Sequence, residues 1–254
     1  MNRKIAEIKS LISSFLFFVF TLTAVFGIVY SVRYIGENMS NEKIPISNVE
    51  TDDRKISLTF DIASGSSNIE TILDILDKYN VKASFFLVGN WVDKNEDIVK
   101  EISSRGHDIG NHSNTHASMK QLSENDLKNE LNTTSSKIEA ITGEKTTMYR
   151  PPFGEFDNNS LKTCEKLGYT VVNWDVDSYD WKEIGPNFVT EKVLKGVSPG
   201  SIVLFHGDIN NNEQYLEKSI KELKEKYDIV PLTKLIYNEG YEVDSKGTQK
   251  LKIK

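Results

Sequence analysis

The sequence predicts a parallel α/β fold, either a barrel or an open doubly wound sheet, behind one apolar N-terminal helix. Three observations support this prediction. An uncharged run occupies residues 10–32, short β-rich runs alternate with helical patterns from residue 55 onward, and polar side chains recur where the β-rich runs end. Alternation of strands and helices is typical of parallel sheets, whose consecutive strands are joined by crossover helices.

The uncharged run is long enough to cross a membrane, because an apolar helix needs about 20 residues to do so. Arg3, Lys4 and Lys9 precede it. Since basic residues favour the cytoplasmic side, we expect residues 1–9 in the cytoplasm, residues 10–32 as a single-pass anchor in the cell membrane, and the rest outside the cytoplasm. The alternative is a cleaved secretory signal, which needs a shorter apolar run and a small-x-small cleavage site that is mediocre here.

The remainder divides into a polar linker (residues 33–53), a globular domain (54–242) and a Lys-rich polar tail (243–254). The domain of about 190 residues is short for a complete eight-stranded barrel, whose usual size is about 250 residues. Apolar residues three and four positions apart predict helices between the β-rich runs. The expected strands are residues 56–60, 83–88, 107–110, 147–150, 170–174, 201–205 and 229–232.

The composition excludes several classes of protein. The formal net charge is −6, which argues against nucleic acid as a partner because binding to phosphates depends on cations. The one cysteine, Cys164, rules out an intramolecular disulfide and a Cys-rich zinc site. The motifs of serine hydrolases, phosphate-binding loops and dinucleotide-binding proteins are missing from the sequence. Nothing demands an oligomer, so we expect a monomer.

Ionisable side chains follow five of the expected strands directly. The carboxyl ends of parallel strands meet on one face of the sheet, so these side chains are expected to form one polar pocket. Any single placement could arise by chance, and the prediction depends on their joint occurrence. The residues are Asp61, His112, His116, Arg150, Asp175, Asp177 and His206.

Two of these residues form a His-x-x-x-His pair, His112 and His116. If the segment turns as a helix, both imidazoles point the same way and can hold one divalent metal. The pair alone is a weak signal, and a zinc site would need a third ligand, usually a carboxylate, with an open position for water. His107 opens a strand and is expected to be structural.

The other residues suit hydrolysis assisted by a metal. Asp61 could take a proton from a metal-bound water, and His206 could protonate a leaving amine. Arg150, fixed by the prolines that follow it, would keep Asp61 ionised, and Asp177 would orient His206. Each also has a plain structural interpretation, such as a turn cap, a surface arginine or a buried histidine bonded to a backbone carbonyl.

Five sequence blocks resemble the polysaccharide deacetylases of the NodB-homology type, carbohydrate esterase family 4, over about residues 55–241. This resemblance implies a distorted (β/α) barrel of about seven strands and hydrolysis of N-acetyl groups on amino sugars of chitin-like polymers or peptidoglycan. The blocks are LTFD at 58–61, HSNTH at 112–116, RPPFG at 150–154, DVDSYDW at 175–181 and VLFH at 203–206.

The resemblance also implies roles for individual residues. Asp61 is similar to the family's general base and His206 to its general acid. Arg150 is similar to the arginine that holds the base, and Asp177 to the acidic residue that tunes the acid. The implied metal ligands, with zinc as the expected ion, are His112 and His116, and the implied substrate-binding residues are Pro151, Phe153, Gly154, Trp181 and Leu204, of which Trp181 and Leu204 would line an acetyl pocket.

One position departs from the family pattern. The first block of the family normally ends in Asp-Asp, with the second Asp as third metal ligand, and Ile62 stands there instead. Asn68, Ser64 or Asp61 itself is a candidate replacement. Residues 62–68 (IASGSSN) and the DSYDW block are similar to a sporulation-associated branch of the family, often called PdaB-like.

The expected function is therefore a membrane-anchored, extracytoplasmic deacetylase whose partner is a cell-wall glycan, in sporulation. The alternative is a catalytically weak or inactive glycan-binding or morphogenetic protein that keeps the deacetylase fold, because Ile62 cannot bind a metal. A third alternative is that the enzyme removes a different acyl group, such as an O-acetyl group.

Overall fold

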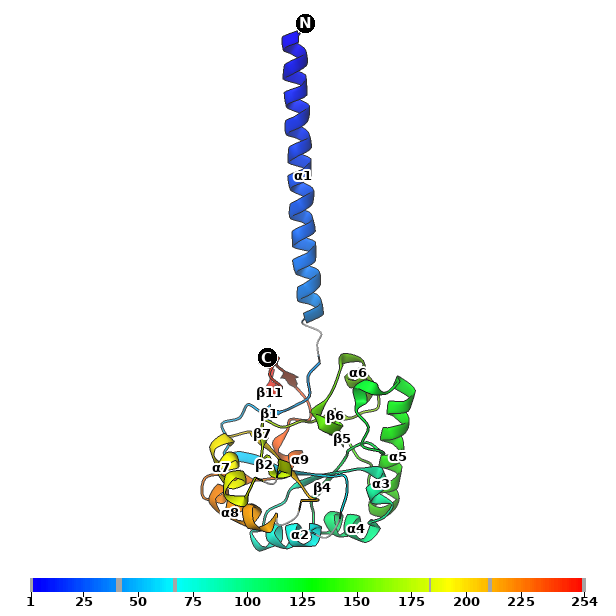
Figure 1. Ribbon diagram of the computed structural model, residues 1–254, viewed down its shortest axis with the longest axis vertical. Helices are drawn as coiled ribbons and strands as arrows, with labels where there is room; N and C mark the ends of the chain where they lie inside the picture. Colours follow the sequence, from blue (N-terminus) through cyan, green and yellow to red (C-terminus); the bar gives the residue numbers. More distant parts are fainter. Residues whose placement is uncertain (1, 40–42, 66–67, 183, 210–211, 253–254) are drawn as a thin grey trace. The chain divides into compact units, whose positions relative to one another are not determined.

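The computed structural model describes residues 2–39, 43–65, 68–182, 184–209 and 212–252 (Figure 1). Two compact units divide the chain, residues 1–42 and 43–254. The first is one long helix, α1 (Asn2–Met39). Its window Ser14–Ser31 has a mean hydropathy of 2.0 and no buried residue, so by length and composition α1 can cross a membrane. A signal sequence near an N-terminus would pass the same test.

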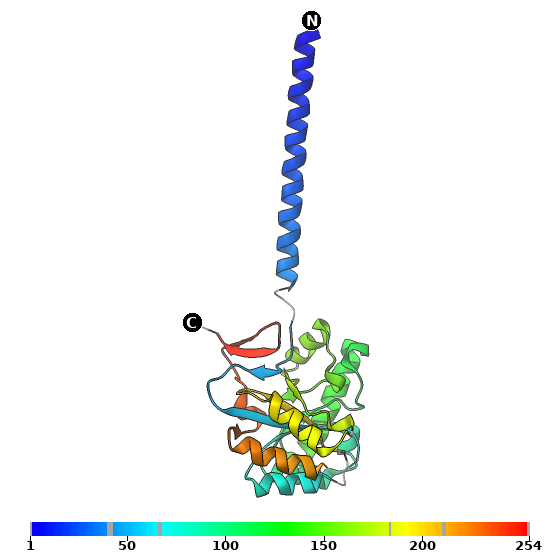
Figure 2. The same cartoon turned by 60° about the vertical axis from the view of Figure 1, so that its left-hand side comes forward.

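The second unit is an α/β fold around a curled parallel sheet, as the sequence predicts (Figures 1 and 2). The strand order is β6-β5-β4-β3-β2-β8-β7, and β9 pairs with the first two residues of β2. Every pairing in this sheet is parallel. The strands are β2 (Lys55–Ile62), β3 (Ser84–Leu87), β4 (Asp108–Asn111), β5 (Met148–Tyr149), β6 (Thr170–Val171), β7 (Val176–Asp177), β8 (Ile202–His206) and β9 (Asp228–Ile229).

Helices surround the sheet and bury its outer face (Figure 2). In α2, apolar side chains at Ile69, Ile72, Leu73 and Leu76 form one buried stripe, because residues three and four apart share a helix face. The helices are α2 (Ile69–Lys78), α3 (Gly89–Val92), α4 (Glu96–Ser104), α5 (Glu124–Thr142), α6 (Asn158–Lys166), α7 (Pro186–Gly196), α8 (Glu213–Lys224) and α9 (Leu232–Leu235), with 3₁₀ turns η1 (Met119–Gln121), η2 (Pro152–Gly154) and η3 (Asp180–Lys182).

A small second sheet corrects two of the sequence predictions. Its strands are β1 (Asn48–Val49), β10 (Tyr241–Val243) and β11 (Thr248–Leu251), so residues 43–53 are not a free linker and residues 243–252 are not a free tail. Ile46 and Val49 are buried in the domain, and so is Gln249. The side-chain amide of Gln249 accepts a hydrogen bond from the Tyr237 N–H and donates one to the Tyr237 carbonyl. The tail prediction was wrong because this strand buries a polar side chain, which hydrophobic patterning cannot detect.

The expected strand at residues 170–174 is also shorter than predicted. β6 ends at Val171, and a separate strand, β7, forms at Val176–Asp177 at the opposite end of the strand order. β7 pairs with β8, which places Asp177 beside Leu204.

Candidate active site

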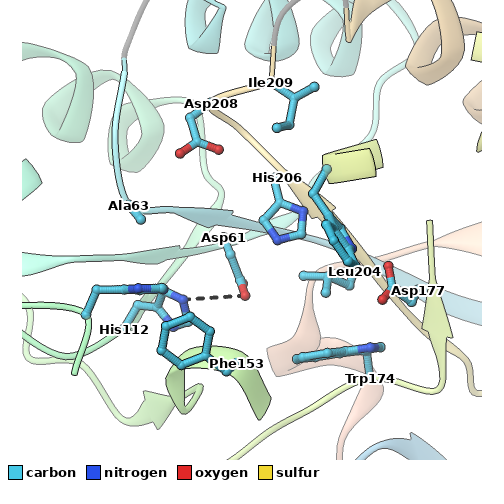
Figure 3. A pocket seen from close by; sticks show the side chains of 12 residues that line it. Asp61, Ala63, His112, Phe153, Trp174, Asp177, Leu204, His206, Asp208 and Ile209 are labelled. Atoms are coloured by element: carbon cyan, nitrogen blue, oxygen red, sulfur yellow. Dashed lines mark ion pairs between the residues drawn. The ribbon is translucent and has the colours of Figure 1, made fainter. Parts of the chain in front are cut away.

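The site lies at the carboxyl ends of the strands, and the sheet register brings its side chains together. Asp61 at the end of β2 is the direct neighbour of His206 at the end of β8. On the other side, β4 ends at Asn111 and is followed by His112, whose backbone N–H donates to Leu87 O on β3. These three strand ends therefore point the side chains of Asp61, His112 and His206 toward one space (Figure 3).

This space is a cavity of about 570 Å³, and five of the seven predicted residues line it: Asp61, His112, His116, Asp177 and His206. Of the other two, Arg150 lies behind the pocket, and Asp175 accepts hydrogen bonds from Ser201 Oγ and the Ile202 N–H instead. Most of its wall is apolar, and its ionisable lining residues are Asp61, His112, His116, Asp177, His206 and Asp208 (Figure 3). Apolar pockets with a few convergent polar groups are typical of small-molecule and glycan sites. The lining residues are Asp61, Ala63, His112, His116, Phe153, Trp174, Asp177, Trp181, Leu204, His206, Asp208 and Ile209.

Arg150 lies behind the pocket, fully buried, and fixes Asp61. Its Nη1 donates to Asp61 Oδ1 at 2.8 Å and to Thr59 Oγ1 at 2.8 Å, while its other nitrogens donate to backbone carbonyls. The guanidinium also lies 4.3 Å from the centre of the Phe86 ring. Burial alone would raise the pKa of Asp61, but the Arg150 charge and hydrogen bond outweigh burial and lower that pKa below its usual value. Asp61 is therefore a carboxylate with one oxygen held by Arg150.

His206 has an acidic partner, but it is Asp180 and not Asp177. The His206 Nδ1 lies 2.8 Å from Asp180 Oδ1, and the His206 backbone N–H donates to Asp180 Oδ2 at 2.8 Å. Burial lowers the pKa of His206, and the Asp180 hydrogen bond and charge outweigh burial, so the pKa is raised. The sequence interpretation of Asp177 as the residue that orients His206 is corrected: Asp177 lines the pocket and accepts the Tyr179 backbone N–H.

The two histidines of the HSNTH block lie close together, although the segment is not helical as the spacing suggested. The ring centres of His112 and His116 are 5.0 Å apart. A loop with positive φ at Ser113 (70°) and His116 (60°) brings them together. Such angles are uncommon for residues other than glycine, so the loop needs support from the surrounding structure.

That support comes from Glu130 on α5. Its carboxylate accepts hydrogen bonds from Ser113 Oγ (2.5 Å), Asn114 N (2.7 Å), Thr115 N (2.8 Å) and Thr115 Oγ1 (3.0 Å). Lys137, also on α5, donates to Asn114 Oδ1 at 2.8 Å. Glu130 was not predicted from the sequence. It lies 14 positions after His116 in a helical segment, and nothing in that spacing indicates hydrogen bonds to the HSNTH block.

The side chains of His112 and His116 provide two of the ligands that a divalent cation needs. The ring of His112 contacts Arg150 O through Nδ1 at 2.8 Å, which leaves Nε2 facing Asp61 Oδ2 at 3.6 Å. Burial lowers the pKa of His112 to about 4 and also lowers the pKa of His116, so both are neutral imidazoles, the form that binds metals. No group of three or more His, Cys, Asp or Glu side chains able to hold a metal occurs among the described residues.

Of the three candidate replacements for the third ligand, Asp61 lines the cavity with Oδ2 facing His112 Nε2, while Ser64 and Asn68 have other partners. Ser64 Oγ donates to Asp208 Oδ2 at 2.7 Å, and Asn68 Nδ2 donates to Ile209 O at 2.8 Å. Neither residue lines the cavity. Ile62 is buried in the apolar core, where a Cβ at Gly207 would lie 2.9 Å from its side chain.

The expected substrate-binding residues divide into two groups. Phe153, Trp181 and Leu204 line the cavity, and Phe153 packs edge-on against His116. Pro151 and Gly154 do not line it. Gly154 instead supports the wall, since its φ is +67° and a Cβ there would lie 2.8 Å from the Trp174 ring. The sequence analysis missed Trp174, together with Ala63, Asp208 and Ile209, which complete the lining.

Comparisons with known proteins identify the family. The model of the polysaccharide deacetylase family matches residues 48–172. The chain is 33% identical over 178 residues to peptidoglycan-N-acetylmuramic acid deacetylase PdaA of Bacillus subtilis, covering 68% of each chain. The chain belongs to the polysaccharide deacetylase family. By class it is a carbohydrate deacetylase, a hydrolase, as the resemblance implied.

Two further relatives of this deacetylase domain are informative. A peptidoglycan-N-acetylglucosamine deacetylase of Bacillus cereus is 35% identical over 176 residues, which cover 68% of this chain and 64% of that protein. The solved structure of a CE4 family pseudoenzyme from Bacillus anthracis is 35% identical, with a TM-score of 0.72, and covers 75% of this chain and 68% of that one. These comparisons support the family and not one branch of it, so the PdaB-like assignment stays a prediction.

Proposed function

We propose that the deacetylase domain removes N-acetyl groups from the amino sugars of a cell-wall glycan of the peptidoglycan type. The observation that carries this proposal is the pairing of Asp61 with His206 across adjacent strands, each with its own fixed ionic partner, in one cavity. Two groups whose environments push their pKa values apart are typical of an acid and a base in catalysis. Relatives that act on peptidoglycan support the choice of substrate.

The reaction assigned to these groups is hydrolysis of an acetamide. Asp61, through the carboxylate oxygen that Arg150 does not hold, accepts a proton from the water whose oxygen attacks the acetyl carbon. His206, whose pKa Asp180 raises, gives its proton to the amine nitrogen as the C–N bond breaks. Acetate and the free amino sugar result.

The family's metal dependence leads us to propose a divalent cation, with zinc as the expected ion, at His112 and His116. Such an ion would polarise the acetyl oxygen and lower the pKa of a bound water. The two neutral imidazoles suit it. Ile62 is buried in the core and cannot be a ligand, and Asp61 Oδ2, 3.6 Å from His112 Nε2, is the nearest carboxylate to the pair that the structure describes.

The test is acetate release from N-acetylated peptidoglycan oligomers by the full chain in detergent, with added zinc or with a chelator. We expect zinc-dependent release, and we expect His206→Ala to lower the rate at least about 10²-fold, since general acid catalysis contributes about 10²–10⁴-fold. Thermal unfolding of the variant separates a lost proton donor from a lost fold. Undiminished release by a folded His206→Ala protein would remove His206 from the mechanism.

A second candidate function is favoured by Ile62 and by the pseudoenzyme among the structural neighbours. In it, the domain binds the glycan without hydrolysing it. Binding of the oligomers without acetate release, in saturating zinc, would support this function over the first.

We also propose that α1 anchors the protein in the cell membrane with the domain outside, and that the protein acts in sporulation. The hydropathy of Ser14–Ser31 and the basic residues before it support the orientation. Protease added to protoplasts should cut the domain, and an uncut domain would contradict this orientation. The sporulation role is supported by the sequence resemblance alone, and a deletion strain with normal spores would contradict it.

A further inference from the structure

The 3₁₀ turn η3 connects the catalytic pair to a group of side chains beside the cavity, Tyr179, Trp181, Lys182 and Lys192, which we call the rim. Its first residue, Asp180, holds His206, and its second, Trp181, lines the cavity wall and is 49% exposed. Its third residue, Lys182, is exposed. Because Asp180 is fully buried and bonded at both carboxylate oxygens, the turn is fixed relative to His206, and so is the backbone that carries Lys182.

Two lysine ammonium groups gather over aromatic rings at this rim. Lys182 Nζ lies 4.3 Å from the ring centre of Tyr179 and 4.9 Å from that of Trp181. Lys192 Nζ, from α7, lies 5.1 Å from the Tyr179 ring centre. Cations at these distances are attracted by the ring faces, which restricts the long lysine side chains to the rim.

Neither ammonium group has a carboxylate partner among the residues that the structure describes. Lys195, one turn along α7 from Lys192, does have one and pairs with Glu191. The rim therefore carries two positive charges without ion-pair partners in the described chain, although the protein as a whole has a formal net charge of −6. A local positive charge on an acidic protein favours an anionic ligand at that place.

We propose that Lys182 and Lys192 form a subsite for a carboxylate on the glycan substrate, next to the sugar that occupies the cavity. This inference rests on the proposed function and narrows its substrate class. A neutral amino-sugar polymer such as chitin has no carboxylate to offer. A peptidoglycan strand carries carboxylates on its peptide stems, or on the lactyl group of a muramic acid that has no stem, so the domain should prefer a muramic acid-containing strand.

The expected effect is modest because both lysines are exposed. Pairs of this kind contribute little in water, so each lysine should change affinity for an anionic glycan by about two- to fivefold. The effect should shrink as salt rises, because the Debye length falls to about 8 Å at physiological ionic strength and to 3 Å at 1 M.

The experiment measures binding to the full chain in detergent carrying His206→Ala, so that the glycan is not consumed. The probes are a muramic acid-containing disaccharide-peptide and neutral chitotetraose, titrated at low and high salt. Lys182→Gln and Lys192→Gln are compared with the control Lys195→Gln. The control makes the same change of charge on α7, the helix that carries Lys192, but it replaces a lysine that already pairs with Glu191.

We expect tighter binding of the anionic probe, weakened two- to fivefold by each rim variant at low salt and left unchanged by Lys195→Gln. Chitotetraose binding should be the same in all variants. Equal weakening by all three lysine variants, or no weakening by the rim variants, would overturn the subsite while leaving the proposed function intact. Failure of both probes to bind would contradict the proposed function itself, and with it the subsite.

Discussion

Replacing Asp180 with asparagine should move the alkaline limb of the pH–rate profile to lower pH. In the folded protein Asp180 raises the pKa of His206 against the opposing effect of burial. Without the negative charge, burial dominates and the pKa of His206 falls. A proton donor with a lower pKa is neutral over more of the alkaline range, so the rate at neutral pH should fall, by about 10²-fold if His206 is the general acid.

The same replacement should also lower stability. Asp180 accepts from His206 N and Nδ1, from Trp181 N and from Tyr215 Oη. An asparagine amide nitrogen cannot accept, so at least one buried donor loses its partner, at a cost of about 1–3 kcal/mol in the free energy of unfolding. The stabilisation from a raised histidine pKa is present below pH 6.5 and is lost as pH rises through the folded pKa, so the stability difference between wild type and variant should be largest at acid pH.

The assay is acetate release between pH 5 and 10, supported by NMR titration of the imidazoles, of which the chain has only four. Asp177→Asn is the matched control, because Asp177 faces the same cavity and does not contact His206. It should leave the titration of His206 in place. A profile shifted by Asp177→Asn and unaffected by Asp180→Asn would refute the assignment of Asp180 as the partner of His206.

Three further changes have defined outcomes. Arg150→Met should lower the free energy of unfolding by about 3–5 kcal/mol in urea melts at neutral pH, because it leaves the buried Asp61 carboxylate without its partner; a change under 1 kcal/mol would contradict the role of this pair. Glu130→Gln should weaken zinc binding about 10–100-fold in a chelator competition, while Glu139→Gln on the same helix should not, and equal effects would argue against Glu130 as the support of the histidine loop. Ile62→Asp should destabilise the zinc-free protein, since it puts a carboxylate in the core. In thermal melts, zinc should raise the Tm of this variant more than that of wild type, and a smaller rise in the variant would show that position 62 is not beside the metal site.

The arrangement of the site could be predicted to a large extent from the sequence. Parallel strands bring their carboxyl ends to one face, so ionisable residues that follow several strands had to meet, and Asp61, His112 and His206 do line one cavity. The link between Arg150 and Asp61 was also predicted, although β5, which precedes Arg150, lies three strands from β2 in the sheet order. The long guanidinium crosses that distance inside the core.

What could not be predicted depends on single backbone angles. The DVDSYD segment offers three aspartates, and Tyr179, with φ at +57°, turns the chain so that Asp180 and not Asp177 reaches His206. The loop between His112 and His116 likewise has positive φ angles where a helix was expected. Non-glycine residues rarely adopt such angles, so composition and periodicity contain no signal for them.

The pairing of β1 with β11 joins positions 48 and 248, about 200 residues apart. Gly200 is packed so closely on this junction that a Cβ there would lie 1.7 Å from Val49 O. Loop-closure entropy opposes a pairing over such a separation, so this pairing should form late in folding, and β1 also contacts Ser201 and Gly200. A protease or a premature stop that removes β11 would therefore take away the parallel partner of Asn48 and Val49 but leave their contacts with Ser201 and Gly200, and it would remove the buried Gln249 from beside Tyr237.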